Sequence, residues 1–250
     1  MHSRSGHGTR RLRAFVVRPG DSVAVWVGVA SLVLCSTLAA CGGSPSSEPV
    51  ETEAHFAREI ELPAPELDGP VPLNRAIHER RSVRDFTAEP LPIDLIGQLM
   101  WAGQGVTSSD GKRASPSAGA TYPLELYVVT ADSVMHYLPA GHRVEHRDSP
   151  DLRGQLQEAA FDQSHVGSAP AVIVIAALFQ RTADKYGDRA RDYVNQESGH
   201  TAQNILLEAT AYGLAAVPTG GFDSAETADL LGLRVDLEPL YLIPTGFPSG

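Results

Sequence analysis

The segment "APAVIVIAAL", residues 169–178, carries the strongest structural signal in this 250-residue chain. Its run of small and β-branched apolar residues shows no polar alternation. Such a run is typical of a strand that is buried on both faces of a sheet. We therefore expect a central sheet with helices packed on both of its sides.

The flanking segments alternate between helical and strand patterns, which indicates an α+β fold with a mostly antiparallel sheet flanked by helices. Strands are expected at 124–130, in a hairpin over 134–146, near 214–218 and at 239–246. Helices are expected at 72–82, 92–105, 149–161, 188–213 and 224–233. In the first helix Leu73, Ala76 and Ile77 form the predicted apolar face. Ser149 and Asp223 are predicted helix caps.

The first 41 residues have the pattern of an export signal. Arginines precede the uncharged apolar run "VAVWVGVASLVLCSTLAAC", residues 23–41, and small residues close it. The ending "LAAC" resembles the lipobox of bacterial lipoproteins, which implies that Cys41 is lipidated after removal of residues 1–40. An uncleaved membrane anchor is the alternative. Residues 41–70, rich in Pro, Glu and Ser, are expected to be a flexible tether to a folded domain at 71–250.

Charge and cysteine content exclude several classes of function. The chain has a net charge of −10, and the predicted signal, which would be removed, holds five arginines and one aspartate, so the remaining chain is more acidic still. An acidic domain argues against nucleic acid as a partner. The two cysteines lie at 35 and 41, so the predicted domain holds no thiol for a disulfide, a nucleophile or a zinc site. His136, His142 and His146 are interpreted as hairpin surface, and no metal site is expected.

Four clusters of residues suit chemistry. The stretch "RRSVRDF", residues 80–86, gathers three guanidinium groups that match the oxygens of a phosphate, although a solvated basic turn has the same composition. The stretch "SPSAGA", residues 115–120, offers little side chain and suits a wall against a planar ligand, with a tight turn as the alternative. It departs from the nucleophile elbow of serine hydrolases and precedes a strand, which disfavours that class.

The other two clusters are a glycine turn and a lysine. The stretch "VPTGGF", residues 217–222, places two glycines between a strand and a helix, where backbone N–H groups can approach a ligand. Lys185 beside Tyr186 stands out because the chain has only two lysines, and a lysine can act as a general acid or base. An ordinary turn and a surface lysine are the respective alternatives.

The order of these clusters resembles the nitroreductase family, and more closely its SagB-type dehydrogenase or thiazoline-oxidase branch. The similarity extends over roughly residues 73–248 and includes "MWAGQGV", "KYGDRARDY", "ESGHTAQNILLEATAYGLAAVPTGGFD" and "PLYLIPTGFP". The resemblance implies a homodimer that binds FMN, with the wall contributed across the dimer interface. It also implies that the long helix through Gly199 and Ala202 forms the dimer core.

The resemblance also assigns roles to individual residues. Arg80, Ser82 and Arg84 would hold the phosphate and ribityl chain of FMN, with Arg81 in support. The ring would lie against Pro116, Ser117 and Ala118. Backbone donors near its reactive nitrogen would come from Thr219, Gly220 and Gly221. Lys185 and Tyr186 are the catalytic candidates.

The sequence thus predicts an exported, membrane-tethered FMN oxidoreductase that moves two electrons between a donor, with NAD(P)H as a candidate, and a small organic or peptide-derived substrate. Two departures from the family stand out: no basic residue follows Arg234 for the phosphate, and export would separate the enzyme from intracellular peptide substrates. The alternatives are a flavin-binding or solute-binding lipoprotein without turnover.

Overall fold

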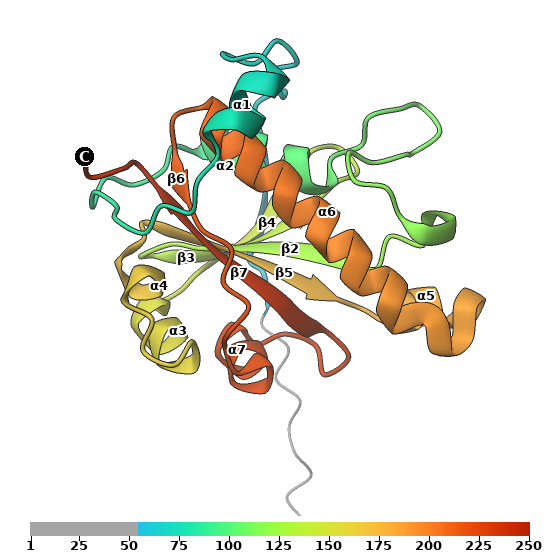
Figure 1. Ribbon diagram of the computed structural model, residues 1–250. Coiled ribbons are helices and arrows are strands. Elements are labelled where there is room, and N and C mark those ends of the chain that lie inside the picture. The colour runs from blue at the N-terminus through green and yellow to red at the C-terminus, as the bar shows by residue number, and fades with distance from the viewer. Residues whose placement is uncertain (1–54) are drawn as a thin grey trace, which may run out of the picture. The chain divides into compact units, whose positions relative to one another are not determined.

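The computed structural model describes residues 55–250 (Figure 1). The predicted signal, Cys41 and residues 42–54 of the predicted tether lie outside these residues. Within the described range seven strands form one sheet in the order β1-β4-β3-β2-β5-β7-β6, and every strand pair is antiparallel. The strands are β1 Arg58–Glu61, β2 Leu124–Val129, β3 Ser133–Leu138, β4 Arg143–Asp148, β5 Ala171–Ala177, β6 Ala215–Ala216 and β7 Glu238–Gly246.

Helices cover both faces of the sheet, as predicted (Figure 1). One face carries α1 Leu73–Glu79, α2 Ile93–Gln104 and α6 Ala190–Ala211, with α5 Gln180–Tyr186 beside the start of α6. The other face carries α3 Arg153–Ala159, α4 Ser164–Ser168 and α7 Ser224–Leu231. The short 3₁₀ helices are η1 Ala118–Ala120 and η2 Gly187–Arg189. No helix of the described part is both long and apolar enough to cross a membrane.

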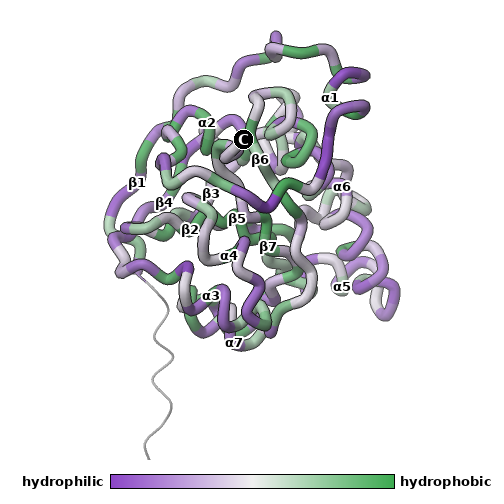
Figure 2. The backbone as a smooth tube through the Cα atoms, turned by 60° about the vertical axis from the view of Figure 1, so that its left-hand side comes forward, coloured by the Kyte–Doolittle hydropathy of each residue, from purple (hydrophilic) through white to green (hydrophobic). Residues whose placement is uncertain are grey.

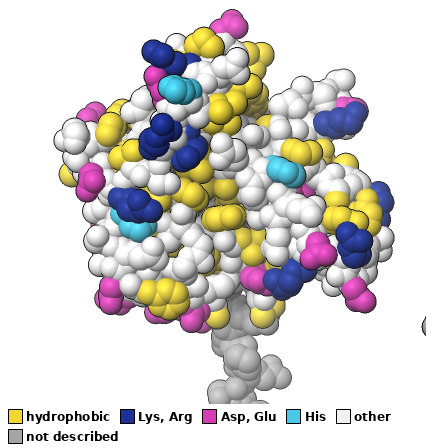
Figure 3. Space-filling view, viewed as in Figure 1, with side chains coloured by type: hydrophobic (Ala, Val, Ile, Leu, Met, Phe, Trp, Pro, Cys, Tyr) yellow, Lys and Arg dark blue, Asp and Glu magenta, His cyan; other side chains and the backbone are white. Residues whose placement is uncertain are grey.

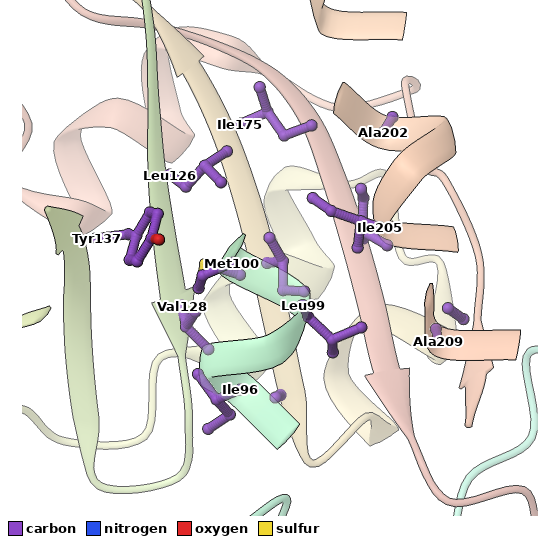
Figure 4. Packing of buried hydrophobic residues seen from close by; sticks show 14 of the residues in the cluster. Ile96, Leu99, Met100, Leu126, Val128, Tyr137, Ile175, Ala202, Ile205 and Ala209 are labelled. Carbon is purple, nitrogen blue, oxygen red and sulfur yellow. The ribbon is translucent and has the colours of Figure 1, made fainter. Parts of the chain in front are cut away.

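Strand β5 is buried along its whole length, which confirms the interpretation of segment 169–178. Ile173 and Ile175 point into the layer under α2 and α6, while Val172 and Val174 point into the opposite layer. Figure 4 shows the first layer, where side chains from α2, β2 and α6 meet over the sheet. In Figure 2 the strands at the centre are hydrophobic, whereas α5 at the edge is hydrophilic. Each fully buried Ile or Val contributes roughly 1.5–3 kcal/mol through burial.

The helical predictions hold with two corrections. Helix α6 spans 22 residues, and Asp223 caps α7 by accepting the N–H of Glu226 at 2.9 Å. Helix α3, however, begins at Arg153 with Leu152 as its cap, so the predicted start at Ser149 is wrong. On α1 the apolar spacing does not mark a buried face: Leu73 is 64% exposed and Ile77 54%, and only their neighbour Ala76 is buried.

The domain begins earlier than the sequence predicted. Residues 58–61, expected in the flexible tether, form the edge strand β1 and pair with β4. Leu62, the next residue, is buried in the core. The strand has only four residues, three of them charged, so its alternation of polar and apolar residues is too short to be distinguished from a glutamate-rich tether. The boundary predicted near residue 71 is therefore corrected to lie before Arg58.

The prediction that the hairpin histidines lie on the surface is wrong for His136. His136 on β3 lies between Glu145 (Nδ1 to Oε2, 2.9 Å) and Glu125 (Nε2 to Oε2, 3.0 Å), and its ring stacks on Tyr127. Burial lowers the pKa of His136, but the bonds to the two carboxylates raise it more, so it ends above 6.5. Burial likewise raises the pKa of Glu125, and its bonds to His136 and the charge of Arg181 bring it below 4.5.

These shifts predict a pH dependence of stability. A histidine whose pKa is raised by folding stabilises the protein fully below pH 6.5, and this contribution is lost as the pH rises through the folded value. The lowered pKa of Glu125 adds stability above pH 4.5 that is lost on further acidification. We expect His136→Gln to reduce the free energy of unfolding by about 2 kcal/mol between these limits, and by less at alkaline pH. Urea unfolding across the pH range measures the difference. The exposed His78→Gln serves as the control, and an equal loss at every pH would contradict the assignment.

Candidate functional site

The arginine-rich loop follows α1 and is tied to the end of the sheet. Arg80 caps α1 through its backbone N–H, which donates to Ala76 at 2.9 Å, and Val83 N–H donates to the carbonyl of Ala216 at 3.2 Å. Ser82 and Arg84 are exposed. Basic side chains gather around α1 on the face shown in Figure 3. The loop therefore presents cationic and hydroxyl groups next to β6.

The side chain of Arg81, predicted to be a supporting contact for the phosphate, bonds to the end of its own helix. Its Nη1 donates to the backbone carbonyls of His78 at 2.9 Å and Arg80 at 2.8 Å. These bonds turn its guanidinium back onto the last turn of α1, where a cation compensates the exposed carbonyl groups. In this conformation Arg81 supports the helix end.

The glycine turn continues directly from β6. Thr219 is bonded to Leu242 of β7 in both directions, with its own N–H donating at 2.7 Å. The backbone donor of Thr219 is therefore used by the sheet, in contrast to its predicted role. Gly220 and Gly221 are exposed, and their N–H groups have no acceptor within residues 55–250. Two adjacent free donors are thus presented where the turn leaves the sheet.

His165 on α4 contacts the glycine turn and is influenced by the charge of Arg84 in the arginine-rich loop. Its side chain is buried, and its Nε2 lies 3.0 Å from the hydroxyl of Thr219. Burial lowers the pKa of His165, and the charge of Arg84 lowers it further. The imidazole is therefore neutral at neutral pH. Arg84, His165, Thr219 and the two free N–H groups together form what we call the anion corner.

The predicted wall stretch, which begins with "SPSAGA", forms a strained wall at residues 116–122. Gly119, Ala120 and Tyr122 have φ values of 61°, 55° and 45°. The left-handed region costs a residue with a side chain on the order of 1–3 kcal/mol. Bonds to neighbouring residues hold this conformation: Ser117 Oγ accepts the N–H of Tyr122 at 2.9 Å, and buried Ser115 donates to the carbonyl of Gly103 at 2.8 Å. Such strain is typical of a functional loop.

The two catalytic candidates contact this wall. Lys185, at the end of α5, donates from Nζ to the carbonyl of Gly119 at 3.2 Å. A Cβ atom added to Gly119 would lie 2.5 Å from both Lys185 Nζ and the hydroxyl of Tyr186. The ring of Tyr186 meets that of Tyr193 edge to face, with centroids 5.0 Å apart. The structure therefore brings Lys185 and Tyr186 into contact with the wall.

A cavity of about 270 Å³ lies between the wall and α6. It is lined by residues 116–118 and by Tyr193, Gln196, Glu197 and His200 of the helix. Its lining side chains carry a serine hydroxyl, a phenol, an amide, a carboxyl and an imidazole. It is an open, mixed surface of the kind that a planar ligand could share with another polypeptide.

The anion corner and the wall are not close to each other in one chain. The corner is tied to Ala216, beyond the end of α6, whereas the wall lies against residues 193–200 in the first half of that helix. Figure 1 shows α1 and α5 at opposite ends of α6. A helix of 22 residues is about 33 Å long. One chain therefore presents two half-sites.

Comparison with known proteins identifies the chain. Residues 77–247 match the model of the nitroreductase family. The chain belongs to that family. It is 38% identical over 193 residues to a nitroreductase homologue of Methanocaldococcus jannaschii, across 75% of this chain and 96% of that protein. The microcin B17-processing protein of Escherichia coli is more distant, 24% identical over 133 residues and 49% of each chain.

Solved nitroreductase-family structures show the same fold. A homologue from Ralstonia eutropha superposes with a TM-score of 0.71 at 28% identity, and the match covers 79% of this chain and 92% of the other. The NADPH:FMN oxidoreductase of Vibrio harveyi, solved with NAD⁺, has a TM-score of 0.55 at 25% identity over 71% of this chain and 69% of its own. Nitroreductase-family membership confirms the predicted fold class and the predicted enzyme class, a flavin-dependent oxidoreductase.

Two residues at the half-sites, His165 and Glu197, were not predicted from the sequence. His165 lies in the short segment "DQSHVGSAP" and Glu197 in the middle of a long polar helix, and neither has a neighbour in the sequence that suggests chemistry. His165 contacts Thr219, and Glu197 interacts with Ser117. In each pair the two residues are more than 50 positions apart in the sequence. Only the fold brings these pairs together. The roles of the predicted site residues remain predictions.

Proposed function

We propose that this nitroreductase-family chain is an FMN-dependent oxidoreductase whose site is completed by two subunits. The observation that carries the proposal is the pair of free N–H groups at Gly220 and Gly221. They follow Thr219, whose hydroxyl lies 3.0 Å from His165, a residue on which the charge of Arg84 acts. A guanidinium suits the phosphate of FMN, and exposed backbone donors suit the electron-rich edge of its ring. When bound, FMN supplies the hydride chemistry.

The residues of this chain would divide the remaining tasks. Arg80, Ser82 and Arg84 would hold the phosphate and ribityl chain, since no basic residue follows Arg234 in the sequence. Residues 116–118 in the wall of the second subunit would cover the ring and exclude water. Lys185 and Tyr186, in contact with Gly119 of that wall, would exchange protons with the substrate.

Substrate and electron donor are inferred from relatives. The NADPH:FMN oxidoreductase of Vibrio harveyi supports a nicotinamide as donor. The sequence similarity to the SagB-type branch, and the distant similarity to the microcin B17-processing protein, support a small organic or peptide-derived acceptor or donor. Donor and acceptor would use the same site in turn, so each must leave before the other binds.

The cofactor proposal is tested by colour and affinity. Purified protein is expected to bind FMN and turn yellow, and a nicotinamide is expected to bleach it anaerobically. Arg84→Ala should weaken FMN binding at least tenfold, about 1.4 kcal/mol, because it removes a charge from the phosphate position. Arg75→Ala, which breaks an exposed ion pair with Glu79 one turn away on α1, should leave the affinity unchanged. Equal affinities in a fluorescence titration of the two variants would refute the role of Arg84.

The dimer interface is proposed to include the outer face of α6. Glycine inside a helix costs about 1 kcal/mol relative to alanine, yet a Cβ at Gly199 would meet no atom within 4 Å. The chain's own packing does not require this glycine, which supports close approach by a second subunit. Ala202, expected in the same interface, is 4% exposed and packs into the chain's own core. Exposed Leu73 and Ile77 on α1 add apolar surface on the same side of the sheet.

Replacing Gly199 should therefore separate folding from dimerisation. Gly199→Gln should fold at least as stably, because glutamine is the better helix former, but should sediment as a monomer and lose FMN affinity. Gly154→Gln on α3, where an added Cβ also meets nothing within 4 Å, is the matched control. Sedimentation velocity compares them. A dimeric Gly199→Gln protein would place the interface elsewhere.

We also propose that the enzyme is exported and anchored by a lipid on Cys41, on the strength of the leader and lipobox pattern alone. Radiolabelled palmitate fed to expressing bacteria should label the wild-type chain and leave Cys41→Ser unlabelled. Labelling of both chains, or of neither, would remove support for the anchor. The site residues lie far along the sequence from Cys41, so the FMN proposal does not depend on it.

A further inference from the structure

Glu197 is an unusual carboxyl group in the cavity beside the wall. It lies on α6, where its side chain lines the cavity of about 270 Å³, yet the residue is only 2% exposed. One of its oxygens, Oε1, is buried and has no hydrogen-bond partner within the described residues. A buried acceptor without a partner costs about 1–3 kcal/mol, and more when it is charged. A structural role gives no reason for an acid here, because an apolar side chain would avoid this cost.

The groups around Glu197 fix its carboxyl group without neutralising it. The Ser117 hydroxyl and the Gln104 amide interact with it, and the charge of Arg113, in the loop before the wall, acts on it as well. Gln104 is itself held by Thr201 at 2.8 Å and by Arg113 at 3.1 Å. From α6 itself, Tyr193 and His200 line the same cavity.

Burial dominates the chemistry of this carboxyl group. It raises the pKa of Glu197 to about 7, although the bonds from Ser117 and Gln104 and the charge of Arg113 lower it. At neutral pH the acid and the carboxylate are therefore both populated. A group with a pKa near the working pH is well suited to give up and regain a proton.

We propose that Glu197 is the proton donor of this cavity, acting through the Ser117 hydroxyl on an acceptor that lies against the wall. Ser117 can relay a proton because its oxygen, which accepts the N–H of Tyr122 at 2.9 Å, has a second lone pair that can accept the O–H of the protonated acid, while its own hydrogen turns to the acceptor. The same serine belongs to the wall that is assigned to the ring. The proposal rests on the proposed function and adds a source of protons to it.

The transfer can be written as a balanced step. The O–H bond of the Glu197 acid breaks, Ser117 receives that proton and passes its own to the acceptor, and Glu197 remains as a carboxylate. Water entering through the open side of the cavity restores the acid. Only a proton moves along this route, since the two electrons that the acceptor gains come from the flavin of the proposed function.

The first test does not require turnover. Infrared spectroscopy of the purified protein, without added FMN, should show a protonated carboxyl band that titrates near pH 7 and disappears in Glu197→Gln. Glu208→Gln is the matched control, because Glu208 lies on the same helix, its pKa is also raised by burial, and it bonds to Gln98 away from the cavity. Loss of the same band in Glu208→Gln alone, or its persistence in Glu197→Gln, would overturn the proposal.

The second test uses FMN-loaded protein reduced with dithionite and mixed with menadione as the acceptor. The reoxidation rate of the wild type should fall above pH 7, and Glu197→Gln should be slower at pH 6 by about 100-fold, with no such pH dependence. Glu197→Asp should recover part of the rate, and Glu208→Gln should behave as the wild type. An unchanged profile in Glu197→Gln would reject Glu197 as the donor while leaving the FMN proposal intact, whereas failure to bind FMN would reject the proposed function.

Discussion

The burial of β5 on both faces is the constraint on which the rest of the structure depends. Its side chains alternate between the two core layers, and its backbone bonds to β2 on one edge and to β7 on the other. Every residue from 171 to 177 is buried, so a shift by one position would exchange the two layers. This register fixes β7, which in turn holds Thr219, and it fixes β2, which follows the wall directly.

The two half-sites are therefore consequences of one sheet. The anion corner forms after β6, where Thr219 pairs with Leu242 of β7 near α4 and the loop after α1. The wall forms before β2 begins, beside α5 and the first half of α6. Helix α6 separates them and remains partly exposed between them. The positive φ values at Ala120 and Tyr122 are a cost that a lone chain does not recover, and the exposed N–H groups at 220–221 are available to a ligand. A cofactor held between two copies would contact the wall of one copy and the free N–H groups of the other.

The sequence predicted the parts that depend on local pattern. The unbroken apolar run at 169–178, the 22-residue α6 and the Asp223 cap each reflect one segment's own residues. It missed β1, whose pairing with β4 needs a distant strand, and it expected α1 to bury Leu73 and Ile77. The burial of His136 and Glu197 depends on groups far along the chain. Pairwise contacts of this kind cannot be read from spacing, and the family resemblance supplied roles without geometry.

The central claim, a site shared between two copies, is tested most directly by mixed dimers. One copy would carry Arg84→Ala in the anion corner and the other Ala118→Trp in the wall, with different tags so that mixed dimers can be purified. Each variant alone should bind FMN weakly. If corner and wall come from different subunits, the mixed dimer has one undamaged site and should bind one FMN with wild-type affinity. A mixed dimer that binds as weakly as its parents would contradict the shared site.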